Sequence, residues 1–143
     1  TLELIKACGQ ESITIAPESC ERLRFSLNKK VTDKQYFDFL ERCNKVDIKK
    51  VKCYMMIGLP DTSKEDTKAF CSFIKEMKKA FNGRLSLSIN IFVPKKNTAW
   101  EDKELLKKQA KEEKQRIKKE IFGMKYTFSS LSLAQKEFST LRK

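Results

Sequence analysis

The sequence predicts an α/β protein, a partial (β/α) barrel of parallel strands flanked by helices. Two observations support this fold class. Three apolar runs have strand length, Ser12–Ala16, Val51–Ile57 and Leu85–Val93, and segments of helical periodicity separate them. Strands that alternate with helices form a parallel sheet through right-handed crossovers. About three core strands cannot close a barrel, so half a barrel is the expected architecture.

Length and composition fit one globular domain. The 143 residues are 40% hydrophobic and include 10 phenylalanines, enough for a buried core. No apolar run approaches the roughly 20 residues of a membrane span, and no charged-then-apolar signal peptide opens the chain. We therefore expect a cytoplasmic protein. Because Thr1 falls inside an expected helix, we also expect this chain to be part of a longer polypeptide.

The five cysteines predict free thiols in a reducing compartment. No two of them have CxxC spacing, and an odd number argues against a closed disulfide framework. The sequence also has no histidine. We therefore expect no complete metal site within this chain.

The first part of the chain is expected to hold one strand between two short helices. Leu2–Cys8 has the pattern of a helix closed by Gly9. Ser12–Ala16 is rich in β-branched residues and is expected to stop at Pro17. A short helix follows, with Ser19 as its expected cap.

Two longer helices begin at expected capping boxes, formed by Thr32 with Gln35 and by Thr62 with Glu65. Gly83 is expected to end the second of them. The apolar positions at helical spacing are Tyr36, Phe37, Leu40 and Cys43 in the first, and Phe70, Phe73, Ile74, Met77 and Phe81 in the second. Both patterns predict amphipathic helices.

The strand Leu85–Val93 has two distinct faces. Its odd-numbered positions are aliphatic, whereas Ser86, Ser88, Asn90 and Phe92 fall on the other face. One interpretation is a half-exposed edge strand whose polar face meets water. The other is a barrel strand whose small polar face lines a wet interior. The strand–helix alternation before it favours the barrel strand.

The last part of the sequence is strongly charged. Glu101–Phe122 is expected to form one long helix, followed by a strand at Lys125–Ser129 and a final helix at Leu131–Leu141. The net charge of +12 permits contact with a polyanion, yet acidic residues precede basic ones at helical spacing, as on a solvated surface. We divide the chain into residues 1–122, the half barrel, and 123–143, the start of a following segment.

Chemistry is expected where the strands end. Glu18 follows the first strand, either as a helix cap or as an acceptor for ligand hydroxyl groups. Gly58 would let a ligand lie close to the backbone. Phe92 and Pro94 offer a flat apolar wall for an aromatic ring, and Lys29 could meet an anionic group. The sequence contains no nucleophile–histidine pair, P-loop or dinucleotide GxGxxG motif.

A family resemblance rests on three segments, in the order ITIAPESCERLRFSLNKKVT, IKKVKCYMMIGLPDTSKED and LSINIFVPKKNTAW. They resemble the fourth, fifth and sixth strand regions of radical S-adenosylmethionine (SAM) enzymes, in the group whose barrel usually follows a cobalamin-binding-type domain. The likeness runs from Leu2 to Trp100, and more loosely to Arg142. The combination of APES, ERLR, NK, MIGLP and FVPK is fairly specific, although each piece alone is not.

This resemblance implies a partial (β/α)₆ barrel that binds SAM beside a 4Fe–4S cluster and generates a 5′-deoxyadenosyl radical. Glu18 would meet the ribose hydroxyls, Lys29 the methionine carboxylate, and Tyr54 another part of the ribose. The residues implied to enclose the adenine are Ile57, Gly58 and Leu59 on one side and Phe92 and Val93 on the other.

Two features depart from the family pattern. The cluster motif CxxxCxxC, which the family carries after its first strand, is absent, so residues outside this segment would bind the cluster and the segment alone should be inactive. The usual glycine-containing turn after the glutamate is replaced by Ser19-Cys20, one residue shorter, which shifts the spacing to Lys29. The rest of the same polypeptide is the expected partner. The open sheet edge also permits pairing with a second copy.

The residues alone leave two other functions open. One is a basic RNA-binding or RNA-modification-associated module that uses the helix Glu101–Phe122 and whose affinity would fall steeply with salt. Aromatic residues interleaved with basic ones on an exposed strand would favour it, and the sequence does not show them. The other is a non-radical (β/α) enzyme fragment or a structural domain, in which Glu18 only caps a helix. The substrate is not determined by this segment.

Overall fold

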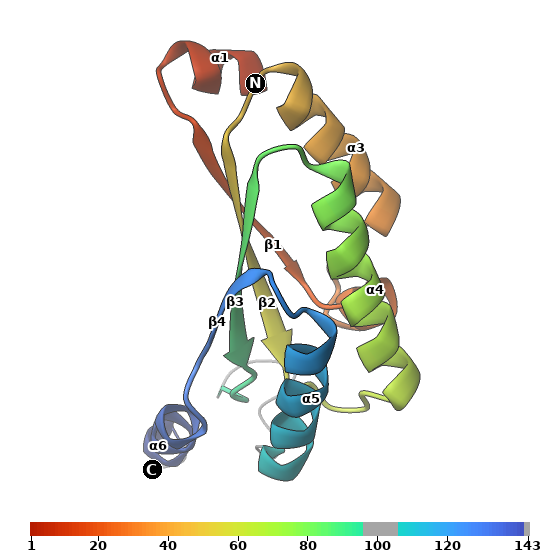
Figure 1. Ribbon diagram of the computed structural model, residues 1–143. Coiled ribbons are helices and arrows are strands. Elements are labelled where there is room, and N and C mark those ends of the chain that lie inside the picture. Colours follow the sequence, from red (N-terminus) through yellow and green to blue (C-terminus); the bar gives the residue numbers. More distant parts are fainter. Residues whose placement is uncertain (96–105, 142–143) are drawn as a thin grey trace.

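The computed structural model describes residues 1–95 and 106–141, which form six helices and four strands (Figure 1). In chain order these are α1 (Leu2–Ala7), β1 (Ser12–Glu18), α2 (Glu21–Ser26), α3 (Asp33–Lys45), β2 (Lys50–Ile57), α4 (Lys64–Ala80), β3 (Arg84–Ile91), α5 (Lys107–Glu120), β4 (Lys125–Phe128) and α6 (Leu131–Leu141). Within these two ranges, the helices are too short or too polar to cross a membrane.

All four strands belong to one parallel sheet with the order β1-β2-β3-β4. β2 and β3 pair without interruption, from Lys50 opposite Arg84 to Ile57 opposite Ile91. Parallel neighbours cannot be joined by a hairpin, and the helices between the strands supply the crossovers. The α/β fold class is thus confirmed. Lys125–Phe128 adds β4 to the three expected core strands and pairs it with β3.

Helices cover one face of the sheet. Side chains alternate along β2, where Val51, Cys53 and Met55 are buried while Lys52 and Tyr54 are exposed. In Figure 1, α3, α4 and α5 lie on the same side of the sheet, and their apolar faces form one core with the buried strand positions. α6 lies apart from this layer, beside the carboxyl ends of the strands. The other face, with Lys52 and Tyr54, points away from the core.

Capping boxes begin both α3 and α4. Thr32 begins α3 with the predicted box. The prediction for α4 is wrong by one residue, because Ser63 and Asp66 form its box. The Thr62 hydroxyl instead donates to the carbonyl of Leu59 at 2.7 Å. Because the Thr62 hydroxyl is bonded to the buried turn before α4, it does not cap the helix, and the next residue, Ser63, is the N-cap.

The carboxyl end of β1 differs from its prediction. The strand does not stop at Pro17 but continues to Glu18, with an irregular register between Ile15 and Glu18. Proline is tolerated here because β1 is an edge strand and the irregularity removes a ladder bond that the proline nitrogen could not donate. The capping role of Ser19 is also wrong, since Cys20 takes the cap position of α2 without a side-chain hydrogen bond.

β3 is an interior strand, so the edge-strand interpretation of Leu85–Val93 is wrong. It pairs with β2 on one side and with β4 on the other, and it ends at Ile91. The predicted helix Glu101–Phe122 is shorter at its carboxyl end, because α5 stops at Glu120. The beginning of that prediction falls in residues 96–105, outside the described ranges.

Candidate functional site

The carboxyl ends of β1, β2 and β3 bring the predicted ligand residues to one edge of the sheet. Glu18 pairs in register with Met55, and Ile57 pairs with Ile91. The backbone N–H of Phe92 donates to the carbonyl of Ile57 at 2.8 Å. The three predicted segments therefore end side by side, where parallel α/β folds usually bind ligands.

Glu18 and Lys29 contact each other at this edge. The Glu18 carboxylate lies 3.5 Å from the Lys29 amine, and the side chains are 26% and 34% exposed, so a ligand can reach both. The same amine donates to the carbonyl of Ala16. No side chain caps α2, and the helix-cap interpretation of Glu18 is therefore wrong. Glu18 also has a left-handed backbone with φ of 67°, a conformation that costs a non-glycine residue about 1–3 kcal/mol.

Arg24 holds the backbone on both sides of Glu18, a role that the ERLR segment of the sequence resemblance does not assign to it. Its buried guanidinium donates to the carbonyls of Pro17 and Ser19, both at 2.8 Å. It also donates to the carbonyl of Val31 at 2.7 Å. A guanidinium presents five N–H donors in a fixed plane. One side chain can therefore maintain the strained backbone of Glu18.

The charge of Arg24 is balanced inside the protein. Asp33 lies 3.0 Å from the guanidinium. Burial raises the pKa of Asp33, and the neighbouring Arg24 opposes that rise. The rings of Tyr36 and Phe73 have their centres 4.7 Å and 4.9 Å from the guanidinium carbon. Since its partners are all supplied by the protein, Arg24 acts as an anchor of the β1 loop.

The turn after β2 is held from the helix side. Gly58 has φ of 73°, and a Cβ atom on this residue would lie 3.2 Å from the Cβ of Ala110 in α5. The Gly58 N–H donates to the Glu113 carboxylate at 3.1 Å. The space that a side chain at position 58 would need is therefore occupied by α5, on the helix side of the turn. A ligand would have to approach the turn from its other side.

Glu113 and Gln109 of α5 are site residues that sequence reasoning misses. The Gln109 amide donates to the Leu59 carbonyl and to the Glu113 carboxylate, both at 2.8 Å. Burial raises the pKa of Glu113, while the hydrogen bonds from Gln109 and Gly58 oppose the rise. The signal in the sequence is weak: Glu113 lies three residues after Ala110, on the apolar stripe of the helix.

An ion pair ties α2 to the start of α4. Arg22 donates to both carboxylate oxygens of Asp66, at 2.7 Å and 2.5 Å, and to the carbonyl of Asp61 at 2.9 Å. Asp66 is the buried residue of the α4 capping box. The hydrogen bonds from Arg22 hold the pKa of Asp66 well below its usual range. The loops that follow β1 and β2 are thereby fixed relative to each other.

The remaining predicted residues meet different surroundings. Ile57, Gly58 and Leu59 are buried as whole residues, backbone included. Phe92 and Val93 are half-buried just after β3 ends. Tyr54 is 37% exposed on the uncovered face of the sheet. The structure therefore brings the adenine candidates together at the neighbouring ends of β2 and β3, with Phe92 and Val93 as the more accessible ones, and it places Tyr54 on the face of the sheet that points away from the core.

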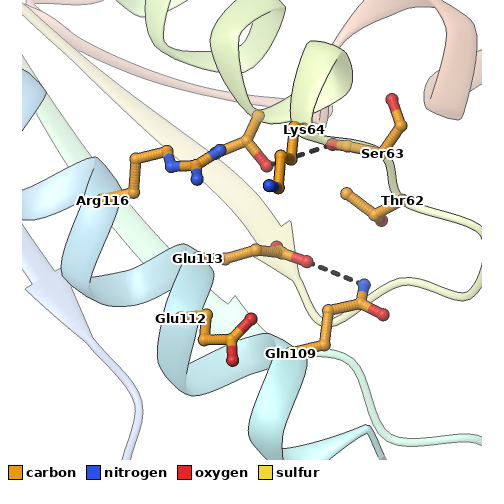
Figure 2. Close-up of a pocket in the computed structure, with 8 residues that line it drawn as sticks. Thr62, Ser63, Lys64, Gln109, Glu112, Glu113 and Arg116 are labelled. Carbon is orange, nitrogen blue, oxygen red and sulfur yellow. Dashed lines mark hydrogen bonds between the residues drawn. The ribbon is translucent and has the colours of Figure 1, made fainter.

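A cavity of about 100 Å³ lies behind the Gly58 turn, between the start of α4 and α5 (Figure 2). Its lining residues are Thr62, Ser63, Lys64, Thr67, Gln109, Glu112, Glu113 and Arg116. None of the eight predicted ligand residues belongs to this lining. The cavity is on the helix side of the sheet, and the predicted ligand edge is reached from elsewhere.

The cysteines do not fit an iron–sulfur cluster. All five are free, and Cys8 is the exposed one. The other four are buried in the folded chain, and burial raises the pKa of Cys53 to about 12 and that of Cys71 to about 11. Within residues 1–95 and 106–141, no three His, Cys, Asp or Glu side chains gather as metal ligands. By contrast, the reachable Glu18 carboxylate fits a pair of ribose hydroxyls in its chemistry.

Comparison with known proteins relates this chain to part of a longer one. No protein-family model matches it. A curated relative from Methanocaldococcus jannaschii, Uncharacterized protein MJ0966, is 30% identical over 134 residues, which cover 90% of this chain and 30% of the relative. The chain therefore spans about 30% of the length of that relative, whose name assigns no activity.

Proposed function

We propose that this chain supplies the ribose and adenine side of the SAM pocket in a radical SAM enzyme. The observation that carries the proposal is the 3.5 Å contact of Glu18 with Lys29 at the edge where β2 ends in the Gly58 turn. A carboxylate and an amine at one sheet edge, with the half-buried Phe92 beside them, match the hydroxyls, carboxylate and purine of SAM in chemical type. The family resemblance of the sequence supports the same assignment.

Each residue has its own role in this proposal. Glu18 accepts hydrogen bonds from the two ribose hydroxyls, because an ionised carboxylate has room for several donors. Lys29 exchanges its contact with the Ala16 carbonyl for the methionine carboxylate. Phe92 packs against the adenine ring, and Tyr54 completes the ribose side. The 4Fe–4S cluster, bound outside this segment, would supply the electron that cleaves SAM to methionine and a 5′-deoxyadenosyl radical.

The rest of the same polypeptide is the proposed partner. β1 is an edge strand of the sheet that the described residues form, so a preceding strand can pair with its outer side. We place the cluster motif CxxxCxxC on that preceding part and the whole enzyme in the reducing cytoplasm. An unpaired edge also pairs readily with a second copy, which would occur when this segment is isolated.

The test uses the natural full-length protein, reconstituted anaerobically with iron and sulfide. Equilibrium dialysis measures SAM binding, and liquid chromatography quantifies 5′-deoxyadenosine after dithionite is added. We expect brown protein that binds SAM and releases 5′-deoxyadenosine. A full-length sequence without CxxxCxxC, or reconstituted protein that binds no SAM, would exclude the proposal.

A polyanion site along α5 is a second candidate function. The lysines that recur on one side of the helix are Lys107, Lys111, Lys114 and Lys118. Lys114 and Lys118 place their amines 5.2 Å and 5.8 Å from the centre of the Phe128 ring. Basic side chains beside an aromatic ring are typical of surfaces that bind single-stranded RNA.

Fluorescence anisotropy with a single-stranded RNA tests this second function. We expect an affinity that falls steeply with salt, because bound phosphates release counterions. Replacing Lys114 and Lys118 by Gln should weaken binding, whereas the same change at the exposed Lys78 and Lys79 of α4 should not. Salt-independent binding, or equal effects of the two double variants, would exclude a site on α5.

A further inference from the structure

Two side chains of α5 hold consecutive peptide groups of the turn after β2. The Gly58 N–H donates to Glu113 Oε2 at 3.1 Å, and Gln109 Nε2 donates to the Leu59 carbonyl at 2.8 Å. Gln109 Nε2 also donates to Glu113 Oε1 at 2.8 Å. Figure 2 shows the two side chains pointing toward each other from neighbouring turns of α5. The contacts form a closed ring between α5 and the turn, which we call the α5 clamp.

Hydrogen-bond chemistry determines how each group of the α5 clamp is oriented. The Leu59 carbonyl can only accept, so Gln109 must present its NH₂ group to it. The second hydrogen of that NH₂ then requires an acceptor on Glu113, and the Gly58 N–H requires another. An ionised carboxylate provides two acceptors and no donor. An amide at position 113 would leave one mismatched contact whichever way it turns.

A buried carboxylate is costly on a helix face that packs against a core. Glu113 is buried on the stripe between Ala110 and Ile117, and its burial disfavours the ionised form. Such a group is tolerated when donors satisfy its oxygens. Among residues 1–95 and 106–141, a donor from outside its own helix is the Gly58 N–H, at the end of β2. The position of Glu113 therefore serves the turn rather than the helix.

We propose that Glu113 and Gln109 are positioning residues, which hold the buried turn of Gly58 and Leu59 and thereby fix the end of β2 beside the adenine of SAM. The inference rests on the proposed function. Both side chains approach the turn from the helix side, where Ala110 also closes on Gly58, so neither touches the ligand. Loosening the α5 clamp weakens cofactor binding and leaves the chemical step unchanged.

The test compares Glu113→Gln with Glu112→Gln in the reconstituted natural full-length protein. Glu112 is the exposed neighbour that lines the same cavity, so its variant is a control for the loss of one negative charge. We expect Glu113→Gln to raise the Kd and KM for SAM about tenfold while kcat changes less than about twofold. It should also speed hydrogen exchange at the Gly58 amide. Glu112→Gln should leave all of these unchanged.

A second variant, Gln109→Leu, removes the contact with Leu59 and should act in the same direction. If urea unfolding shows that Glu113→Gln does not fold, this variant decides by the same criteria. Faster exchange at Gly58 with unchanged Kd and KM would overturn the positioning role, as would a fall in kcat alone. If the wild-type protein binds no SAM, the proposed function fails and the positioning role with it, whereas the exchange measurement still reports whether the α5 clamp holds the turn.

Discussion

The Lys29 amine lies 3.5 Å from the Glu18 carboxylate, although the whole of α2 separates the two residues in the sequence. The chain returns to the strand end because Asn28 is left-handed, with φ of 59°, and the Lys29 N–H donates to the Arg24 carbonyl at 3.1 Å. The shorter turn at Ser19-Cys20 therefore does not keep the two side chains apart.

Glu18→Gln should weaken SAM binding by the full-length protein by about tenfold or more, because a neutral amide offers one acceptor where the carboxylate offers two. The free energy of unfolding should change by less than about 1 kcal/mol, since the ion pair is partly exposed. Equilibrium dialysis and urea unfolding measure the two effects. Glu11→Gln is the matched control, because Glu11 also lies 3.5 Å from a lysine, Lys6. Equal SAM affinity of both variants would contradict the ribose role of Glu18.

Arg24→Met should lower the free energy of unfolding by about 3–5 kcal/mol, because it leaves three carbonyls and the Asp33 carboxylate without their buried partner. Arg42→Met removes an exposed guanidinium 5.9 Å from the Phe39 ring, and should cost less than about 1 kcal/mol. Urea unfolding of both variants checks this. Similar losses would show that Arg24 is not the anchor of the β1 loop.

Acid should destabilise the protein partly through Asp66. Its pKa is held low in the folded state by hydrogen bonds from Arg22, so the unfolded chain takes up a proton at this carboxyl more readily. The stabilisation is fully present above the unfolded pKa of about 3.9 and is lost as the pH falls below it.

Urea unfolding of Asp66→Asn across this acidic range measures the effect. The variant should be less stable than the wild type at neutral pH, and the difference should shrink on acidification. Glu65→Gln alters an exposed carboxylate that pairs with Lys68 at 3.5 Å, and should follow the wild-type curve. A difference in unfolding free energy between wild type and Asp66→Asn that stays constant down to low pH would contradict the role of Asp66.

Gly58→Ala should destabilise the protein more than Gly9→Ala. Both glycines have a left-handed backbone, with φ of 73° and 78°, so each alanine costs about 1–2 kcal/mol of conformational strain. At Gly9 a Cβ atom meets nothing within 4 Å, whereas at Gly58 it lies 3.2 Å from Ala110. Urea unfolding gives both losses, and adding Ala110→Gly to Gly58→Ala shows how much of the excess is contact. Equal losses of unfolding free energy in the two variants would show that α5 shifts to accommodate the added Cβ atom.

The presence and type of the helices and strands can be predicted well from this sequence, because the spacing of apolar residues shows which side of an element is buried. The two faces of β3 and the start of α3 at Thr32 follow from local patterns and are confirmed. Predictions fail where a side chain has a choice of partners. Thr62 is a plausible cap by type, yet its hydroxyl bonds the Leu59 carbonyl, a group that is buried only in the folded turn.

The sequence by itself determined the α/β class and the placement of Glu18, Gly58 and Phe92 at one sheet edge, because successive parallel strands all end on the same side. Only the tertiary structure decided that Arg24 is an interior anchor and that Glu113 holds the Gly58 turn. A charged side chain has no periodicity that reveals its partner. Its role depends on which distant carbonyls and amides the fold brings within hydrogen-bonding distance. It also depends on how deeply the fold buries these groups.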